Sequence, residues 1–371
     1  MRIVVDCSRL RGAPPEDREH FRDLVRTLLV KGSGHTYALS GWPESACGDS
    51  AAFLSPLPAH AASWSVEPSG VRVGLTAKGP ERTGPGTFVY FPLGAPGRSE
   101  PWGPPGAPAL VAAGGLEDEP KELAAIERVS RRFETWIHVW TRRAGEGLAR
   151  LGLPAERILP VPPPAGAPGA WDLDEPRGGG TEESYVAVSP HGLRLREFAG
   201  ALRALQREAN ERGRTIFALV LGRPSLRLRL CARLFGRERV RSAGDRSRSE
   251  CVSLLAGARA LLAGRGDRRS WFWIGEALSR GVPVLAPSEP SLSEFLGDAA
   301  LYYPAARRRR IPAGIWRWFL SEATARILSR RAFDRARALS WESYANRLLD
   351  LFARVARREV SAAGGTPSSV A

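Results

Sequence analysis

Short apolar runs alternate with amphipathic segments through the second half of the chain. The runs at 185–189 and 216–221 are rich in aliphatic and aromatic residues, which is typical of strands buried on both faces. The segments at 195–212 and 248–256 repeat apolar residues at helical spacing. The same rhythm predicts strands at 239–242, 258–263 and 282–286 and helices at 226–235 and 273–280. This alternation predicts a doubly wound α/β sheet of parallel strands, which binds ligands at the carboxyl ends of its strands.

The first half opens in the same way. Arg2 to Cys7 predicts a buried strand, 20–30 predicts a helix after a polar loop at 9–19, and 35–40 predicts a second strand. Later segments predict helices at 120–133 and 142–151, a strand at 135–140 and a turn leading into a strand at 155–161. The region 46–108 is rich in Pro, Gly, Ala and Ser, and its only strand candidates are 71–75 and 88–91.

A chain of 371 residues exceeds the usual span of one domain. The Pro- and Gly-rich stretch at 162–183 does not favour regular structure and is typical of a linker. We therefore expect two domains with a linker, a closing helix and a disordered tail. Their expected bounds are 1–165 for the N-terminal domain, 166–183 for the linker, 184–338 for the C-terminal domain, 339–360 for the closing helix and 361–371 for the tail.

The formal net charge of +15 comes almost entirely from arginine, because the only lysines are Lys31, Lys78 and Lys121. With abundant Ala, Gly and Pro, this bias is typical of a GC-rich genome. Two clusters concentrate positive potential, and they consist of Arg265, Arg268 and Arg269 and of the run 307–310. Each cluster is a solvated face, a site for phosphate or anionic lipid, or a nucleic-acid contact. No recognition helix accompanies them, so no nucleic-acid partner is expected.

The sequence also indicates a compartment. No apolar run approaches the roughly 20 residues that span a bilayer, and Arg2 and Asp6 place charge where a signal peptide needs apolar residues. We therefore expect a cytoplasmic protein. The four cysteines lack CxxC spacing, which favours neither a disulfide framework nor a zinc site.

The most specific pattern lies at 276–301. Glu276 to Pro287 reads E-A-L-S-R-G-V-P-V-L-A-P, and Ser291 to Leu301 reads S-L-S-E-F-L-G-D-A-A-L. These segments resemble the nucleotide-binding half of the family 4 (group 1) retaining glycosyltransferases. Further segments resemble that family in the same order, at 142–160, 238–261 and 339–349. The resemblance implies a GT-B fold, in which two Rossmann-like parallel-sheet domains face a cleft and a C-terminal helix crosses back to the N-terminal domain.

The resemblance also implies particular donor contacts. Glu276 matches the second carboxylate of the family's E-x7-E motif and is the candidate catalytic residue, which would hydrogen-bond donor hydroxyls. Alternatively, Glu276 is a helix N-terminal glutamate favoured by the helix dipole. Arg194 and Arg196 lie near the family's diphosphate-binding basic pair, or else form the polar start of a helix. Donor contacts through side chains or backbone amides are further implied at Arg268, Ser270, Ser291 and Glu294.

The chain departs from the family pattern at three places. Arg268 replaces the first glutamate of the E-x7-E motif, the charged stretch 12–20 replaces a glycine-rich turn, and Ala112 to Gly115 replaces a His-Asp pair. His138 is expected in the core or at its rim, and His191 is expected in a turn rather than as a base.

Two functions are compatible with these residues. The first is a hexosyltransferase-type enzyme that moves a sugar from a nucleotide-sugar to a glycan or lipid-linked acceptor with retention of configuration, in peripheral contact with the inner face of the membrane. The second is a GT-B protein that has lost turnover and acts as a binding or partner subunit. Neither needs a metal or a cofactor, because protein cations and helix dipoles stabilise a leaving diphosphate. The donor base, the sugar and the acceptor are not encoded in any motif of the sequence.

Overall fold

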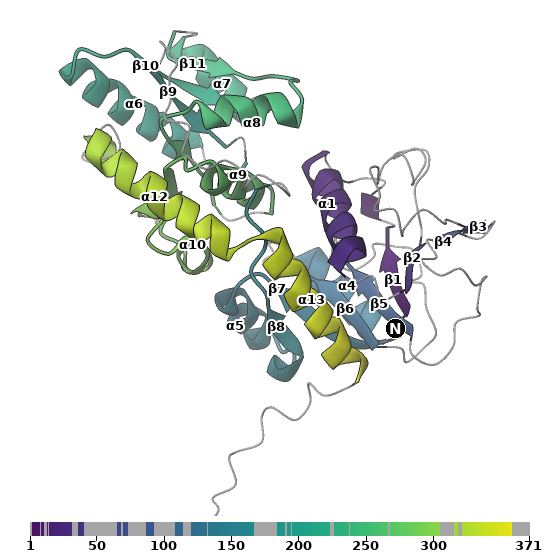
Figure 1. Ribbon diagram of the computed structural model, residues 1–371. Coiled ribbons are helices and arrows are strands. Elements are labelled where there is room, and N and C mark those ends of the chain that lie inside the picture. Colours follow the sequence, from purple (N-terminus) through teal and green to yellow (C-terminus); the bar gives the residue numbers. More distant parts are fainter. Residues whose placement is uncertain are drawn as a thin grey trace, which may run out of the picture. The chain divides into compact units, whose positions relative to one another are not determined.

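A computed structural model gives the architecture of the chain (Figure 1). It describes residues 2–7, 9–10, 13, 15–31, 36–40, 65–67, 70–72, 87–92, 108–113, 120–131, 133–166, 184–189, 191–193, 195–222, 226–236, 238–265, 268–304, 315–317 and 321–357. The chain forms two compact units, Met1–Pro163 with Trp341–Ala371 (unit 1) and Pro164–Ser340 (unit 2). Of the linker predicted at 166–183, only residue 166 is described, and the predicted tail lies outside the described residues.

Unit 1 is built on a six-stranded sheet of order β2-β1-β5-β6-β7-β8, in which all neighbouring strands are parallel. The strands are β1 (Arg2–Asp6), β2 (Thr36–Ser40), β5 (Thr87–Phe91), β6 (Pro108–Ala112), β7 (Glu134–Val139) and β8 (Ile158–Pro160). A separate antiparallel pair consists of β3 (Ser65–Glu67) and β4 (Gly70–Arg72). β4 covers the start of the strand predicted at 71–75, whereas 73–75 lie outside the described residues. The sequence pattern did not predict β6.

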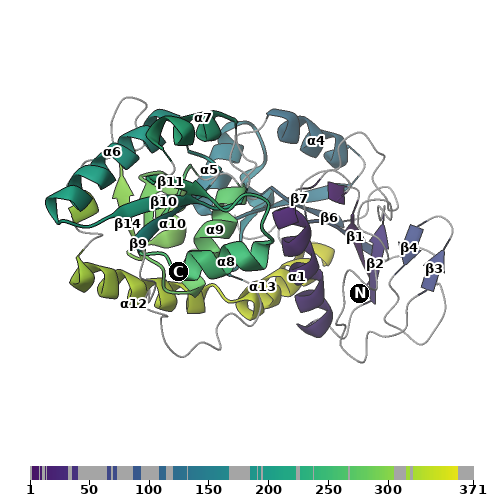
Figure 2. The same cartoon turned by 90° about the horizontal axis from the view of Figure 1, so that it is seen from above.

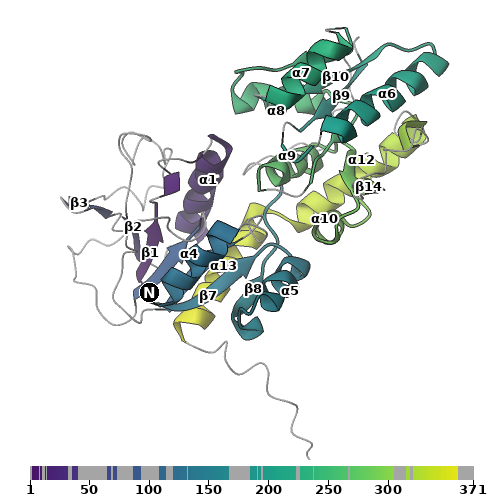
Figure 3. The same cartoon turned by 180° about the vertical axis from the view of Figure 1, so that it is seen from behind.

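Helices cover both faces of this sheet (Figure 3). α1 (Pro15–Lys31) and α13 (Trp341–Ala356) pack on the face that bears Leu110, whereas α4 (Pro120–Ser130) and α5 (Arg142–Arg150) pack on the face that bears Val111. This division arises because successive side chains of a strand point to opposite faces. A short 3-10 helix, η3 (Ala155–Arg157), precedes β8. The prediction of a loop at 9–19 is wrong from Pro15 onward, where α1 begins. Proline suits the first turn of a helix, because the N–H that it lacks has no partner there.

The C-terminal helix α13 belongs to unit 1, so the predicted closing helix that crosses back is confirmed. Its apolar side is buried in one cluster with β1 and α1. The rings of Trp341 and His20 lie 5.2 Å apart, and those of Phe352 and Tyr90 lie 4.9 Å apart. A chain segment that is distant in sequence thus completes the core of the first unit.

Unit 2 contains a second parallel six-stranded sheet, of order β11-β10-β9-β12-β13-β14. Its strands are β9 (Ser184–Val188), β10 (Ile216–Val220), β11 (Val240–Ser242), β12 (Leu261–Leu262), β13 (Val284–Pro287) and β14 (Ala300–Tyr303). Every residue of β10 is buried, as its unbroken apolar run predicts. β12 is shorter than the strand predicted at 258–263, and β14 was not predicted.

The helices of unit 2 are α6 (Leu195–Glu211), α7 (Leu226–Phe235), α8 (Arg248–Ala256), α9 (Arg268–Ser279), α10 (Pro290–Leu296) and α12 (Glu322–Ala338). α8 starts with a capping box, in which Ser247 Oγ accepts from Glu250 N at 3.3 Å and Glu250 Oε2 accepts from Ser247 N at 2.8 Å. α9 begins at Arg268 rather than at residue 273, so Arg268 to Trp271 form its first turn. The predicted α/β fold with two parallel sheets is confirmed.

Candidate functional site

The strand order of unit 2 reverses beside β9. From β9 the chain proceeds to β10 and β11 on one side, and it then returns to build β12, β13 and β14 on the other. At such a switch point the loops that follow the two central strands diverge and leave a crevice for ligands. In unit 2 these loops are 189–193 after β9 and 263–265 after β12, and α9 begins just beyond the second. The candidate site consists of these two loops and the first turn of α9.

The two loops are in direct backbone contact. Gly192 has a φ of +72°, and Arg265 N donates to Gly192 O at 3.1 Å. A Cβ on Gly264 would lie under 3.0 Å from backbone atoms of residues 191–193. The buried Ser270 Oγ, on α9, donates to His191 O at 3.1 Å. Only glycine permits this approach at 192 and 264, and the hydrogen bond from Ser270 fixes the β9 loop to the first turn of α9.

Arg265 is held by two carboxylates at the carboxyl end of β12. Its Nη1 lies 2.9 Å from Glu289 Oε1, and its Nη2 lies 3.8 Å from Glu197 Oε1. The hydroxyl of Tyr303 donates to Ala263 O at 2.9 Å. Burial, reinforced by the charges of Glu197 and Glu289, raises the pKa of Tyr303 well above its usual range, so this hydroxyl stays neutral at physiological pH. The cluster ties β12 to β14.

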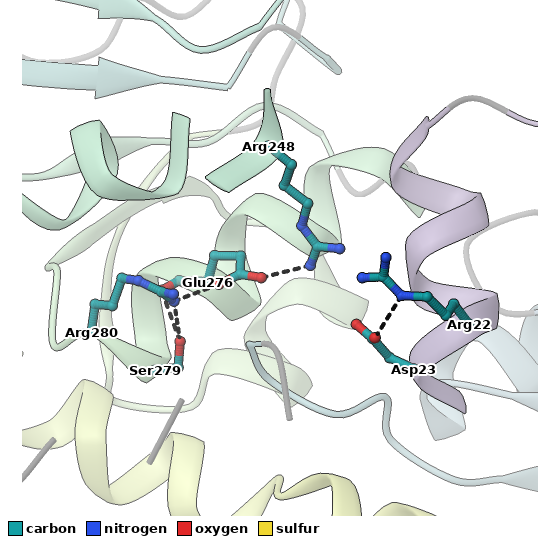
Figure 4. A network of polar contacts seen from close by, with 6 residues as sticks. All are labelled: Arg22, Asp23, Arg248, Glu276, Ser279 and Arg280. Atoms are coloured by element: carbon teal, nitrogen blue, oxygen red, sulfur yellow. Dashed lines mark hydrogen bonds and ion pairs between the residues drawn. The ribbon is translucent and has the colours of Figure 1, made fainter. Parts of the chain in front are cut away.

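Glu276 is almost fully buried between two arginines (Figure 4). The residue is 1% exposed, its Oε1 lies 2.6 Å from Arg248 Nη2, and its Oε2 is paired with Arg280 Nη1. Arg280 Nη1 also donates to Ser279 Oγ at 2.9 Å, and Ser279 Oγ donates to Glu276 O at 3.0 Å. Glu276 lies in the C-terminal half of α9. The alternative of a helix N-terminal glutamate is therefore wrong, whereas donor binding by Glu276 stays a prediction.

Of the residues predicted to bind the diphosphate, Arg196 is exposed in the first turn of α6, the helix that follows the β9 loop. Arg194 and the side chain of Arg268 lie outside the described residues. Ser270 reaches the switch point, where its hydroxyl supports the β9 loop. Their contacts with a donor stay predictions.

Ser291 and Glu294 lie on α10, which follows β13. Ser291 is half-buried and Glu294 is exposed. The carbonyl of Glu294 accepts from Arg335 Nη2 at 2.8 Å, which anchors α10 to α12. These two residues therefore stand at the carboxyl end of a strand next to β12, and their predicted contacts with a donor also stay predictions.

Sequence reasoning missed the partners of Glu276. Arg280 lies four residues after Glu276 on a predicted helix, and this spacing brings opposite charges together. The sequence could therefore have predicted the pair of Glu276 and Arg280. Arg248 lies 28 residues away in sequence, and nothing in the sequence points from it to Glu276. The pairing of Arg265 with two carboxylates likewise depends on tertiary structure.

The rest of the described molecule adds few chemical groups. In unit 1, Arg22 Nε lies 3.4 Å from Oδ1 of the buried Asp23 (Figure 4). His138 is fully buried, with Nε2 3.0 Å from Val161 O, which confirms the prediction of a core residue.

In the described ranges no cluster of three or more His, Cys, Asp or Glu side chains could bind a metal ion. No helix within those ranges is both long and apolar enough to cross a bilayer.

The sequence matches no protein-family model and none of the curated proteins. Solved structures, in contrast, resemble the fold over almost its whole length. A glycosyltransferase from Rickettsia africae ESF-5 has a TM-score of 0.58 at 10% identity, covering 95% of this chain and 98% of that one. WaaG, a glycosyltransferase involved in lipopolysaccharide biosynthesis, has a TM-score of 0.58 at 14% identity, with 95% and 99% coverage. HepE from Anabaena, in complex with UDP-glucose, has a TM-score of 0.59 at 11% identity, with 95% and 99% coverage. The chain therefore has the fold of the GT-B glycosyltransferases.

Proposed function

We propose that the chain is a hexosyltransferase-type GT-B enzyme of the family 4 type, which binds a nucleotide-sugar at the switch point of unit 2. The observation that carries this proposal is the backbone contact between loops 189–193 and 263–265 beside the first turn of α9. The sequence resemblance at 276–301 and the GT-B fold support it. HepE, which has the same fold, was solved with a nucleotide-sugar bound.

The switch point offers what a leaving diphosphate needs. The N-terminus of α9 provides backbone N–H groups and the positive end of a helix dipole, and Arg196 provides a permanent positive charge. In the reaction, the bond between the anomeric carbon and the diphosphate oxygen breaks, and both electrons leave with the diphosphate. The acceptor hydroxyl oxygen bonds to that carbon, and its proton passes to an oxygen of the departing diphosphate. Preorganised cations and N–H groups lower the barrier because they stabilise the charge that develops on the diphosphate.

The stereochemistry and the acceptor are part of the same proposal. The likeness of Glu276 and its neighbours to a retaining family supports retention of configuration, which the anomeric signals of the product in an NMR spectrum would test. A glycan or lipid-linked acceptor, reached in peripheral contact with the inner face of the membrane, is consistent with the arginines at 268–269 and 307–310. Nucleic acid is not a proposed partner.

A thermal-shift panel of UDP, GDP, ADP and their sugar conjugates tests donor binding. We expect one nucleotide-sugar to raise the Tm, and to raise it further as its concentration grows beyond Kd. Arg196→Gln should lower the affinity for that ligand about tenfold, because the substitution removes a charged hydrogen-bond donor to phosphate. Arg207→Gln, which changes another exposed arginine of α6, should bind the ligand like the wild type. The absence of a shift with every nucleotide and conjugate would contradict the proposal.

One observation favours the second candidate, a GT-B protein that binds a donor without turnover. Each carboxylate oxygen of Glu276, the residue proposed for catalysis, is already paired with an arginine. Slow hydrolysis of the donor in the absence of an acceptor separates the candidates. An active enzyme releases free sugar from the nucleotide-sugar that stabilises it, whereas a binding subunit leaves that compound intact.

A further inference from the structure

Helix α7 carries leucines on both of its sides. Leu228 points into unit 2 and is 2% exposed, as the apolar residue of a surface helix should be. Leu230 is 54% exposed and Leu234 is 87% exposed. These two residues are four positions apart and therefore share the outward face. A pair of outward leucines one turn apart is an apolar surface that the core of unit 2 does not use.

The same surface is strongly basic. Arg229 and Arg233 are exposed beside the two leucines, and Arg203 and Arg207 are exposed on α6, which runs alongside α7 (Figures 1 and 2). Arg203 Cζ lies 5.8 Å from the ring of Phe235 at the end of α7, which fixes one contact between the two helices. No acidic residue occurs from Arg212 to Arg237. We call the set Arg203, Arg207, Arg229, Leu230, Arg233 and Leu234 the α6–α7 surface.

We propose that the α6–α7 surface docks onto an anionic lipid bilayer. Exposed leucines beside cations are the pattern of a helix that lies in the headgroup region, where the apolar side chains enter the acyl boundary and the arginines meet phosphates. A second copy of the chain fits less well, because an isologous contact would bring the arginines against one another. Nucleic acid would bind the arginines but would leave the leucines without a partner. The inference rests on the peripheral membrane contact in the proposed function and names the surface that would make it, although docking itself needs neither donor binding nor turnover.

The expected effects follow from charge and apolar area. Each arginine near an anionic surface contributes about a fivefold increase in binding, so Arg229→Gln with Arg233→Gln should weaken vesicle binding about 25-fold. Leu230→Ser with Leu234→Ser should weaken it on the order of 100-fold, since both side chains lose the transfer into the bilayer. Because all four residues are exposed, these variants should fold like the wild type.

Flotation of the full chain with vesicles tests the proposal. We expect the protein to float with vesicles that contain about 30% phosphatidylglycerol and not with vesicles of pure phosphatidylcholine. About 0.5 M salt should release it from the anionic vesicles, because salt screens surface charges. Ile327→Ser on α12 is the matched control, because Ile327 is also 54% exposed. Its neighbours Arg330 and Arg331 are paired with Asp334 and Asp298. This control should float like the wild type.

Two results would overturn the docking surface. The first is that the wild-type protein does not float with anionic vesicles. The second is that the leucine double variant floats as well as the wild type. Binding to duplex DNA that is equally strong in the leucine variant and in the wild type would assign the arginines to nucleic acid instead. The donor thermal shift is measured on the same variants. A variant that loses vesicle binding but keeps its donor shift isolates the docking surface, whereas a missing donor shift with intact flotation counts only against the proposed function.

Discussion

Replacing Glu276 with alanine should lower the free energy of unfolding by about 3–5 kcal/mol, the usual cost of leaving buried charges without their partner. The carboxylate separates two guanidinium groups whose side chains are only 15% and 16% exposed. Without it, Arg248 and Arg280 would keep their charges in a poorly hydrated environment and would repel each other. Urea denaturation followed by circular dichroism measures the change, provided that the slope of the transition stays constant.

Two further variants separate the charge from the packing. Glu276→Gln keeps the size of the side chain and should be less damaging than alanine, although it still removes the compensating charge. A triple variant with methionine at 248, 276 and 280 removes all three charges and should recover most of the lost stability, because apolar side chains of similar volume often replace buried ion pairs without loss. Glu294→Ala, which changes an exposed carboxylate on α10, should stay within about 0.5 kcal/mol of the wild type. A Glu276→Ala protein as stable as the wild type would show that the ion pairs contribute nothing.

The triple variant also addresses the role of Glu276 in function. If the carboxylate serves the fold alone, the refolded triple variant should bind the donor as the wild type does. If the carboxylate hydrogen-bonds donor hydroxyls, stability should return while the thermal shift by the donor does not. Stability and donor binding therefore report separately on two roles that a single alanine substitution would confuse.

The sequence predicted those elements that bury a continuous or periodic apolar pattern. β9, α6, β10, α7 and α8 match their predicted ranges within about a residue, because their strands are apolar throughout and their helices repeat an apolar stripe. β14 was missed because it is only four residues long, and periodicity alone cannot tell so short an apolar run from part of a helix. α12 was missed because its buried side is narrow and includes Ala332 and Ala336 among many arginines.

The candidate site was harder to predict than the fold. The apolar pattern placed Glu276 correctly on a helix, but no pattern could supply Arg248, since an ion pair across 28 residues leaves no local signal. The helix predicted from residue 273 also begins too late, because buried aromatic contacts hold Trp271 in α9, with Trp271 and Phe295 ring centroids 4.5 Å apart. Local sequence thus fixes the periodicity of the elements, and tertiary contacts decide where they begin and which charges meet.

Gly264→Ala should destabilise unit 2 by about 3 kcal/mol and should abolish the thermal shift produced by the donor. The new Cβ would lie under 3.0 Å from backbone atoms of His191, Gly192 and Leu193. A side chain could rotate away from the new methyl group, but backbone atoms cannot. The loop after β9 must therefore move away from the end of β12, and this overpacking costs stability. That movement would also pull His191 O from the Ser270 hydroxyl, which lies 3.1 Å away, and would open the switch point where the proposal places the diphosphate.

Gly200→Ala provides the matched control for this substitution. Gly200 lies inside α6 in the same unit, and a Cβ there would meet no atom within 4 Å. Because alanine favours the helix more than glycine does, the control should stabilise the protein by about 0.5–1 kcal/mol and leave the donor shift unchanged. The same methyl group added at two glycines should therefore act in opposite directions. If Gly264→Ala retained both its stability and its donor shift, the tight backbone contact between the two loops could not be what forms the site.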